Sequence, residues 1–411
     1  MEACGTKGRS FSPGCWSALR KAGDSAMQAI VNGSIFMPDH IEKGACLLFA
    51  EKIIGVVAPG EVPMDAGVID AKGGAVIPGL IDMHIHGYLG ADASDGSFEG
   101  LRVMAEGLAR NGVTGFLPTT MTVPEDELRV AFAQIRAAMS ASRGADWRGA
   151  QVLGLNAEGP FINPVKKGAQ AGENIRPGDA AFLEEYLDIL RVFTIAPEMP
   201  GNMDCIRAMA GKCLIAMGHT AADCDQATAA IEAGVRHVTH LFNAQTPLKQ
   251  RAPGVVGAAL TDDRVSCELI ADTFHVDRRL FPLVARMKGE MLVLISDCTR
   301  AGGLPDGEYS LGGQPIFVKG VECRLPNGTI AGSVLKLNQA VRNLLANTTL
   351  TPWQAVNAAS LNPARRLGLT AKGSLEPGKD ADIVVCDSDF NILRTIIGGK
   401  TVHAAPAGVP S

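Results

Sequence analysis

Side chains that can bind a metal ion or transfer a proton follow most of the apolar runs in this sequence. They are His84, His86, Glu158, His219, His240, His275 and Asp297. His84 and His86 end the stretch PGLIDMHIHG. Side chains two residues apart in a strand point to the same side, so both imidazoles can reach one ion. An isolated pair of this kind can be incidental, whereas the whole set at successive strand ends predicts a metal centre.

The expected centre divides into an essential ion and a second ion. A carboxylate and two imidazoles, Glu158, His219 and His240, form a three-ligand site with a position left for water. His84 and His86 are predicted to hold a second ion beside it. Asp297 is interpreted as the acid–base group, with metal ligand and turn cap as alternatives. His237 lies at the opposite strand parity from His240, so it is predicted to be structural.

Eight short β-rich runs carry these residues, and helical stretches such as EDELRVAFAQIRAAM separate most of them. The predicted strands cover residues 80–86, 113–120, 150–158, 191–198, 213–220, 237–243, 266–275 and 291–298. Eight alternating units of this kind predict a (β/α)8 TIM-like barrel, in which chemistry gathers at the carboxyl ends of the strands. A doubly wound open sheet is the alternative, but no G-x-G-x-x-G follows the first strand.

Both ends of the chain predict additional β-structure. Alternating apolar residues with Gly, Pro and Asp fill residues 27–78 and 372–403, which are expected to form one small β-sandwich-like domain. The barrel domain is then 79–371. Within it, an inserted hairpin is expected over 313–332, followed by helices at about 333–348 and 351–361. Residues 1–26 are expected to be a poorly ordered extension.

Composition limits the classes of partner. The 411 residues are 46% hydrophobic, enough for a large core, and a net charge of -5 gives no support for binding nucleic acid or an anionic membrane. The ten cysteines include no C-x-x-C, and no signal peptide or membrane span is evident. The sequence therefore predicts a cytoplasmic protein with reduced thiols that acts on a small molecule.

Several motifs resemble the N-acetylglucosamine-6-phosphate deacetylase family of the amidohydrolase superfamily. They include PGLIDMHIHG, NAEGPFINPVKKGA, MGHTAA, THLFNAQTPLKQRAPG, ISDCTRAGGLPDGEYSLGG, GTIAGSVLKLNQAVRN, ASLNPARRLGL and GSLEPGKDADIVV. The resemblance extends from about residue 27 to 403. It implies hydrolysis of the acetamide of N-acetylglucosamine-6-phosphate to glucosamine-6-phosphate and acetate, within amino-sugar catabolism or cell-wall recycling.

The resemblance also implies roles for individual residues. Glu158, His219 and His240 match the ligands of the catalytic ion, Asp297 matches the acid–base, and His84 and His86 match members that bind a second ion. Zinc is the expected metal, with Fe, Mn, Co, Ni or Cd as alternatives. The residues that match substrate contacts are Ala169, Gln170, Asn243, Ala244, Arg251, His275, Ile330, Ala331 and Gly332. Arg251 matches an arginine that reaches the 6-phosphate from the neighbouring subunit, which implies a homodimer.

Two positions depart from the family pattern. Gln170 stands where the family commonly has a substrate-contacting histidine, and Ala252 follows Arg251 where a glutamate is common. Other functions therefore stay open: deacetylation of N-acetylgalactosamine-6-phosphate, hydrolysis of a cyclic amide, or a non-catalytic relative. The intact set of Glu158, His219, His240 and Asp297 argues against the last.

Overall fold

The computed structural model describes residues 26–406, so nearly all of the predicted extension over residues 1–26 lies outside the described residues. Parallel strands form a nearly closed ring in the order β8, β11, β13, β14, β15, β16, β17, β18, with the short β12 also paired to β11. Their bounds are β8 (Leu80–Ile85), β11 (Val113–Thr120), β12 (Gln151–Val152), β13 (Leu155–Glu158), β14 (Leu190–Ile195), β15 (Leu214–Met217), β16 (His237–Val238), β17 (Ser266–Ile270) and β18 (Leu292–Ile295). The predicted barrel is confirmed.

A turn of the chain helps to close the ring between β18 and β8. The amide of Leu294 donates to the carbonyl of Ala358 at 2.7 Å, and the amide of Ile81 donates to the carbonyl of Ala359 at 2.8 Å. Nearer the site, the amide of Asp297 donates to the carbonyl of His84 at 2.9 Å. Strands β18 and β8 are therefore linked in two places. One is this turn, and the other is the bond between Asp297 and His84 at the ends of the strands that carry the candidate metal ligands.

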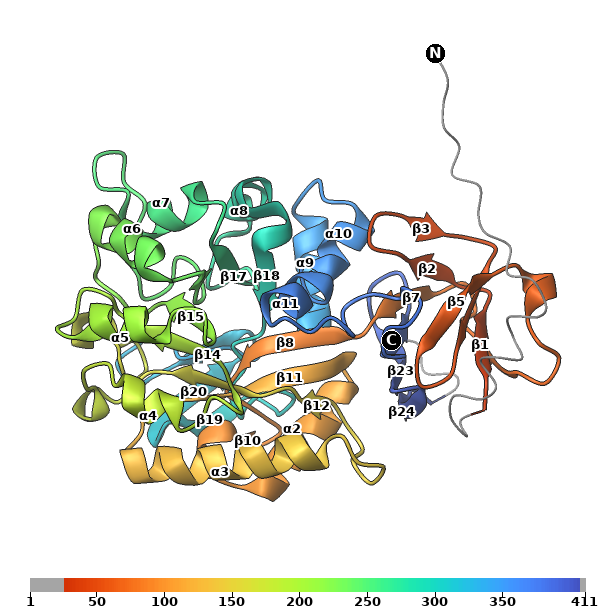
Figure 1. Ribbon diagram of the computed structural model, residues 1–411, viewed down its shortest axis with the longest axis horizontal. Helices are drawn as coiled ribbons and strands as arrows, with labels where there is room; N and C mark the ends of the chain where they lie inside the picture. The colour runs from red at the N-terminus through yellow and green to blue at the C-terminus, as the bar shows by residue number, and fades with distance from the viewer. Residues whose placement is uncertain (1–25, 407–411) are drawn as a thin grey trace, which may run out of the picture.

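Helices cover the outside of the ring (Figure 1). The α-helices are α2 (Phe98–Ala109), α3 (Glu125–Ala141), α4 (Ala180–Glu184), α5 (Asn202–Met209), α6 (Cys224–Ala233), α7 (Gly254–Thr261), α8 (Phe281–Lys288), α9 (Leu337–Ala346), α10 (Pro352–Asn357) and α11 (Leu361–Arg366). The 3-10 helices are η1 (Pro59–Glu61), η2 (Ala93–Asp95), η3 (Pro164–Lys166), η4 (Gly172–Asn174), η5 (Arg278–Leu280) and η6 (Gly289–Met291).

Helix α3 illustrates why these segments are helical. Its first turn carries three acidic residues, which favour the positive end of the helix dipole. Its buried residues are Leu128, Ala131, Phe132, Ile135 and Ala138, a spacing of three or four that lines one face.

The single helix predicted over 351–361 is wrong, because α10 ends at Asn357 and the chain passes through the Ala358–Ala359 turn that bonds to β18 and β8.

Residues from both chain ends form two further sheets, at the right of Figure 1. One has the order β5-β4-β1-β6 and the other β24-β23-β22-β7-β2-β3. Their strands are β1 (Gln28–Val31), β2 (Ser34–Phe36), β3 (Ile41–Glu42), β4 (Cys46–Phe49), β5 (Ile53–Val57), β6 (Gly67–Asp70), β7 (Ala75–Pro78), β22 (Ile383–Cys386), β23 (Ile392–Ile397) and β24 (Lys400–Ala404). We propose 27–78 plus 372–403 and 79–371 as the domain boundaries.

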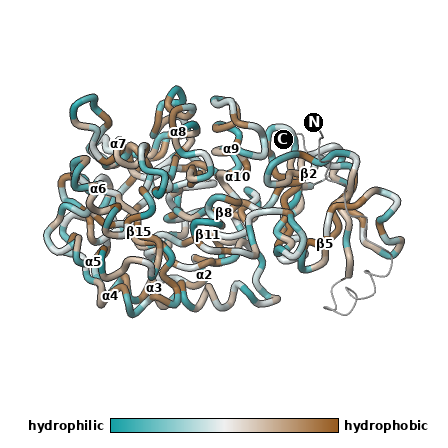
Figure 2. The backbone as a smooth tube through the Cα atoms, turned by 45° about the horizontal axis from the view of Figure 1, so that its top comes forward, coloured by the Kyte–Doolittle hydropathy of each residue, from teal (hydrophilic) through white to brown (hydrophobic). Residues whose placement is uncertain are grey.

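Two small antiparallel sheets lie among the loops of the barrel. The hairpin predicted over 313–332 is present as β20 (Gln314–Lys319) and β21 (Glu322–Arg324), and β19 (Gly307–Leu311), which precedes the predicted range, adds a third strand. The other small sheet pairs β9 (Gly87–Tyr88) with β10 (Ala91–Asp92). Strand β15 of the ring consists of apolar, mostly buried residues, and its tube is brown in Figure 2. Within residues 26–406, no helix combines the length and apolarity needed to cross a bilayer.

Candidate active site

Three of the predicted metal-binding and catalytic residues follow their strands in left-handed backbone conformation. The φ angles are 47° at His219, 27° at His240 and 50° at Asp297. Such angles are costly for residues other than glycine and tend to occur where function requires them. The predicted strands 213–220, 237–243 and 291–298 therefore extend too far, since β15, β16 and β18 end at Met217, Val238 and Ile295. The turns bring all three side chains to the mouth of the barrel.

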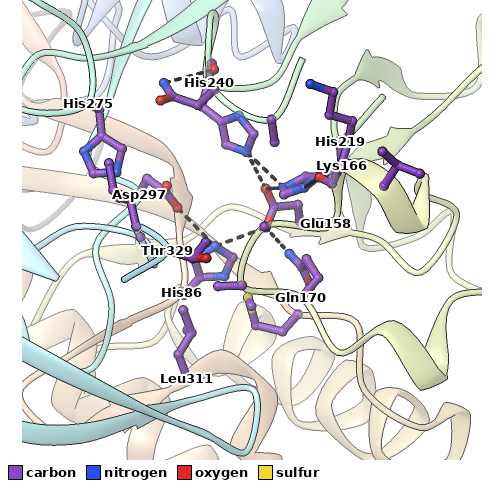
Figure 3. Close-up of a pocket in the computed structure, with 18 residues that line it drawn as sticks. His86, Glu158, Lys166, Gln170, His219, His240, His275, Asp297, Leu311 and Thr329 are labelled. Carbon is purple, nitrogen blue, oxygen red and sulfur yellow. Dashed lines mark hydrogen bonds and ion pairs between the residues drawn. The ribbon is translucent and has the colours of Figure 1, made fainter. Parts of the chain in front are cut away.

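Glu158, His219 and His240 meet at one point (Figure 3). Glu158 Oε1 lies 3.1 Å from His219 Nε2 and 2.9 Å from His240 Nε2, and the two imidazole nitrogens are 3.2 Å apart. Ligand bonds of about 2.0–2.1 Å around a tetrahedral ion place the ligand atoms roughly 3.3 Å from one another. The three atoms thus have nearly the separation that a zinc-like ion requires, and two nitrogens with one oxygen suit such an ion.

His84, His86 and Asp297 form a second group beside the first. Asp297 Oδ1 lies 3.1 Å from His86 Nε2 and 3.5 Å from His84 Nε2. Within the described residues, His84 Nε2 and Asp297 Oδ1 are buried without a hydrogen-bond partner, which is costly unless a ligand satisfies them. These orphaned atoms fit a metal ion. Asp297 therefore belongs to the geometry of this second group as well as facing the pocket.

The opposite ring nitrogens support the same assignment. Nδ1 of His219 lies 2.8 Å from the carbonyl of Lys166, Nδ1 of His86 lies 3.0 Å from the carbonyl of Thr119, and Nδ1 of His84 lies 2.9 Å from Glu268. A carbonyl or carboxylate oxygen accepts, so each Nδ1 carries a hydrogen and each Nε2 is the nitrogen that would bind an ion. Metal-binding histidines are usually held in this way.

Electrostatics keep the carboxylates of the site ionised. Burial opposes ionisation of Glu158, but the charges of His84 and His219, with hydrogen bonds from the imidazoles, hold its pKa well below the usual range. Burial likewise opposes ionisation of Asp297, and His86 and His84 lower its pKa. Conversely, burial disfavours the charged form of His86, yet Asp297 and Glu158 raise its pKa to about 10. Without an ion, the negative charges of these carboxylates are therefore compensated by protonated imidazoles such as His86.

Ion binding is therefore expected to release protons. At pH 7 the imidazole of His86, with its pKa near 10, carries a proton that a metal ion must displace. Each released proton raises the apparent affinity by about tenfold per pH unit while the pH stays below that pKa. Calorimetric titration of Zn²⁺ between pH 6 and 8, in buffers of different ionisation enthalpy, measures the number released. A count of zero across that range contradicts this account of the site.

The two groups open into a cavity of about 380 Å³. Its lining includes most of the predicted substrate-contacting residues, namely Ala169, Gln170, Asn243, Ala244, His275, Ile330 and Gly332. His275 Nδ1 donates to Asp272 Oδ2 at 2.6 Å, so Nε2 is the ring nitrogen available to a ligand. Ala331 is fully buried and does not line the cavity. Arg251 is exposed on the segment before α7. It does not belong to the cavity lining that residues 26–406 form.

Gln170 is bonded to a metal-ligand candidate. Its Nε2 donates to Glu158 Oε2 at 2.6 Å, and its Oε1 accepts from the amide of Thr122 at 2.6 Å. The glutamine thus orients Glu158 so that Oε1 faces His219 and His240. The resemblance implied a substrate contact at this position. The geometry adds a positioning contact that the sequence comparison did not indicate.

Sequence reasoning missed other parts of the site. The cavity is also lined by Met121, Val165, Lys166, Gly168, Leu311 and Thr329. Lys166 Nζ donates to the carbonyl of Gln245 at 3.1 Å, which places a cation at the rim. The contacts of Glu268 with His84 and His240 were also missed. The sequence contained one indication of these contacts, because Glu268 is a charged residue within the otherwise uncharged strand SCELI, and a buried charge needs partners.

A comparison with known families identifies the chain. The sequence profile of the amidohydrolase family matches residues 75–402. The chain belongs to the amidohydrolase family. This assignment agrees with the barrel, the paired histidines at the end of β8 and the acidic residue after β18.

Individual amidohydrolases of known name are similar over most of their length. N-acetylglucosamine-6-phosphate deacetylase of Bacillus subtilis (strain 168) is 40% identical over 332 residues, 79% of this chain and 84% of the relative. N-acetylgalactosamine-6-phosphate deacetylase of Escherichia coli O157:H7 is 39% identical over 360 residues, which cover 86% of this chain and 93% of the relative. A solved N-acetyl-D-glucosamine-6-phosphate deacetylase variant from Mycobacterium smegmatis, in complex with N-acetyl-D-glucosamine-6-phosphate, is 28% identical with a TM-score of 0.83, covering 92% of this chain and all of that one.

Proposed function

We propose that this amidohydrolase hydrolyses the acetamide of N-acetylglucosamine-6-phosphate to glucosamine-6-phosphate and acetate. The observation that carries the proposal is the convergence of Glu158 Oε1, His219 Nε2 and His240 Nε2, all within 3.2 Å of one another, at a cavity that Asp297 and His275 also line. The named relatives and the sugar phosphate bound in a similar structure support the substrate.

Glu158, His219 and His240 would hold the catalytic ion, with zinc favoured by the two-nitrogen, one-oxygen donor set and Fe, Mn, Co, Ni or Cd as alternatives. A bound divalent ion acidifies a water and polarises the acetamide carbonyl. His84, His86 and Asp297 would hold a second ion in the same manner. This arrangement assigns the chemistry to the mouth of the barrel, the usual place in this fold.

Asp297 supplies the proton transfers. Its lowered pKa keeps the carboxylate ionised at neutral pH, so it can accept a proton from the attacking water. The same oxygen then returns that proton to the nitrogen of the breaking C–N bond, and the amine leaves. His275, whose Nδ1 is bonded to Asp272, would lie beside the acetamido group in this cavity. The backbone and amide groups at Asn243 and Ala244 orient the sugar.

Substrate identity is tested by measuring acetate release from N-acetylglucosamine-6-phosphate, N-acetylgalactosamine-6-phosphate and unphosphorylated N-acetylglucosamine. The glucose epimer is expected to have the highest kcat/KM. The galactose epimer is the second candidate, because a relative of that name is 39% identical over 86% of the chain. Equal turnover of the unphosphorylated sugar contradicts the phosphate requirement, and no acetate from any of the three overturns the proposed reaction.

Arg251 is proposed to bind the 6-phosphate in the active site of a second copy within a homodimer. Its exposure, outside the cavity of its own chain, is compatible with such a contact. Arg251→Ala removes a charge-assisted hydrogen bond, so kcat/KM for the sugar phosphate is expected to fall by about 10- to 100-fold. The unphosphorylated sugar should be unaffected, and Lys249→Ala, a neighbouring exposed cation, is the matched control.

Mixed dimers distinguish a contact between subunits from one within a subunit. Arg251→Ala chains are unfolded and refolded together with Asp297→Asn chains, and activity is compared with each variant refolded alone. If Arg251 acts across the dimer, hybrids contain one site with both an intact Asp297 and an intact arginine, so activity is partly restored. Activity no higher than the mean of the two variants contradicts the proposal.

A further inference from the structure

Glu268 is a buried carboxylate that the proposed chemistry does not use. It lies in the middle of β17, a strand whose residues are all buried, and its side chain is 0% exposed. An ionised carboxylate is placed in such an environment only at high cost unless donors satisfy it. The donors around Glu268 are therefore informative about its role.

Glu268 contacts one residue from each candidate ion group through the same oxygen. Its Oε2 lies 2.9 Å from His84 Nδ1 and accepts from the backbone amide of His240 at 2.9 Å. His84 belongs to the group with His86 and Asp297, whereas His240 belongs to the group with Glu158 and His219. Because the Glu268 carboxylate accepts from Nδ1, Nε2 is the nitrogen of His84 that is left to bind an ion, and it lies 3.5 Å from Asp297 Oδ1.

A second histidine holds Glu268 from behind. His237 Nε2 lies 3.1 Å from Glu268 Oε1, and His237 Nδ1 lies 2.7 Å from Ser266 Oγ. Since the carboxylate accepts, His237 donates from Nε2, and its Nδ1 is bonded to the Ser266 hydroxyl, which donates to the carbonyl of Arg236 at 3.1 Å. Ser266, His237, Glu268 and His84 thus form one buried hydrogen-bonded series that ends at the orphaned Nε2 of His84. Each member is fully buried, which fixes the orientation of the next.

We propose that Glu268 is a positioning residue for metal binding, supported by His237. It holds the His84 ring so that Nε2 faces His86 and Asp297, and it anchors the turn at His240. Its main effect is on the ion held by His84, His86 and Asp297, because the side chain of His84 is bonded to it directly, whereas His240 is bonded only through the main chain. This inference rests on the proposed metal-dependent function.

The test is metal binding by the full chain carrying Glu268→Gln, a substitution of nearly equal shape. The substitution removes the negative charge that His84 Nδ1 and the His240 amide contact, and the new NH₂ group faces either His237 Nε2 or these two N–H donors. Dissociation constants and stoichiometry are measured with Co²⁺ and Zn²⁺ by equilibrium dialysis, and the visible Co²⁺ spectrum reports the ligand field. His84→Ala identifies which ion depends on His84. Thermal unfolding without metal checks that the variants fold.

Glu268→Gln is expected to weaken the His84-dependent ion by about 10- to 100-fold, with a changed Co²⁺ spectrum, and to alter the other ion far less. His237→Gln keeps Glu268 and should weaken the same ion to a smaller degree, which tests the proposal if Glu268→Gln fails to fold. Asp382→Asn, a buried carboxylate paired with Lys372 near the chain-end sheets, is the matched control and should change neither ion.

Three results overturn the proposal. Glu268→Gln leaves the dissociation constants of both ions unchanged, or it weakens the binding of both ions equally, or His84→Ala shows that neither ion depends on His84. The acetate assay keeps the underlying function separate. Unmodified protein that binds both ions and releases no acetate from the sugar phosphates refutes the proposed reaction, while selective weakening by Glu268→Gln still supports the positioning role.

Discussion

Asp297→Asn is expected to lower kcat for acetate release from N-acetylglucosamine-6-phosphate by about 10²- to 10⁴-fold, the usual contribution of a positioned acid–base group. The amide cannot accept the proton of the attacking water or return one to the departing nitrogen. Asp297 is suited to both steps because His86 and His84 lower its pKa and its side chain faces the cavity. Steady-state kinetics between pH 5 and 9 provide the measurement.

The control for this variant is its metal content. Glu158, His219 and His240 are unchanged in Asp297→Asn, so one ion per chain should remain even where the ion of the second group is lost. Loss of the first ion as well would mean that the activity change reports metal loss rather than proton transfer. Turnover within threefold of the unmodified enzyme, with the ion retained, would contradict the assignment of Asp297.

Glu158→Gln is expected to abolish binding of the catalytic ion at micromolar concentrations and, with it, acetate release. Glu158 Oε1 is the atom on which His219 and His240 converge, and its negative charge is the only one in that group. Outer-sphere partners of a metal site typically change affinity by about 10- to 100-fold, so loss of a ligand charge should exceed about 100-fold. Equilibrium dialysis followed by elemental analysis gives the constant.

Glu198→Gln is the matched control for this substitution. Glu198 follows β14 on the same face of the barrel and accepts from Thr220 Oγ1 and the amide of Ala221, outside both ion groups. It should keep both ions. A Glu158→Gln protein that retains its ion with unchanged affinity would show that Glu158 is not a ligand, and the metal assignment of the first group would have to be withdrawn.

The fold was predictable because its strongest signals are local. Alternating β-rich and helical runs gave the barrel, and β11 covers the predicted residues 113–120. The strand ends were less predictable, since His219, His240 and Asp297 lie in left-handed turns whose conformation is decided by the contacts around them. The Ala358–Ala359 turn was missed for a similar reason: its peptide groups bond to β18 and β8, which are distant in the sequence.

The site was predictable where residue type alone restricts the chemistry. Histidines and acidic residues at strand ends indicated the candidate ligands, and the structure brings these side chains together in two groups that could each hold an ion. The supporting contacts were not predictable, because they depend on side-chain packing between strands. His237 was expected to be structural, and its bond to Glu268 shows what it supports. Gln170 was expected to contact substrate, and its bond to Glu158 is visible only in three dimensions.

The most direct test of the central claim is metal removal and restoration with one preparation. Acetate release from N-acetylglucosamine-6-phosphate is measured before chelation, after dialysis against a chelator until less than about one chain in twenty retains an ion, and after Zn²⁺ is returned. Activity should fall in proportion to the amount of ion removed and recover as one ion per chain rebinds. In the Glu158→Gln variant, returning Zn²⁺ should not produce activity. Undiminished acetate release by the metal-free protein would contradict the account.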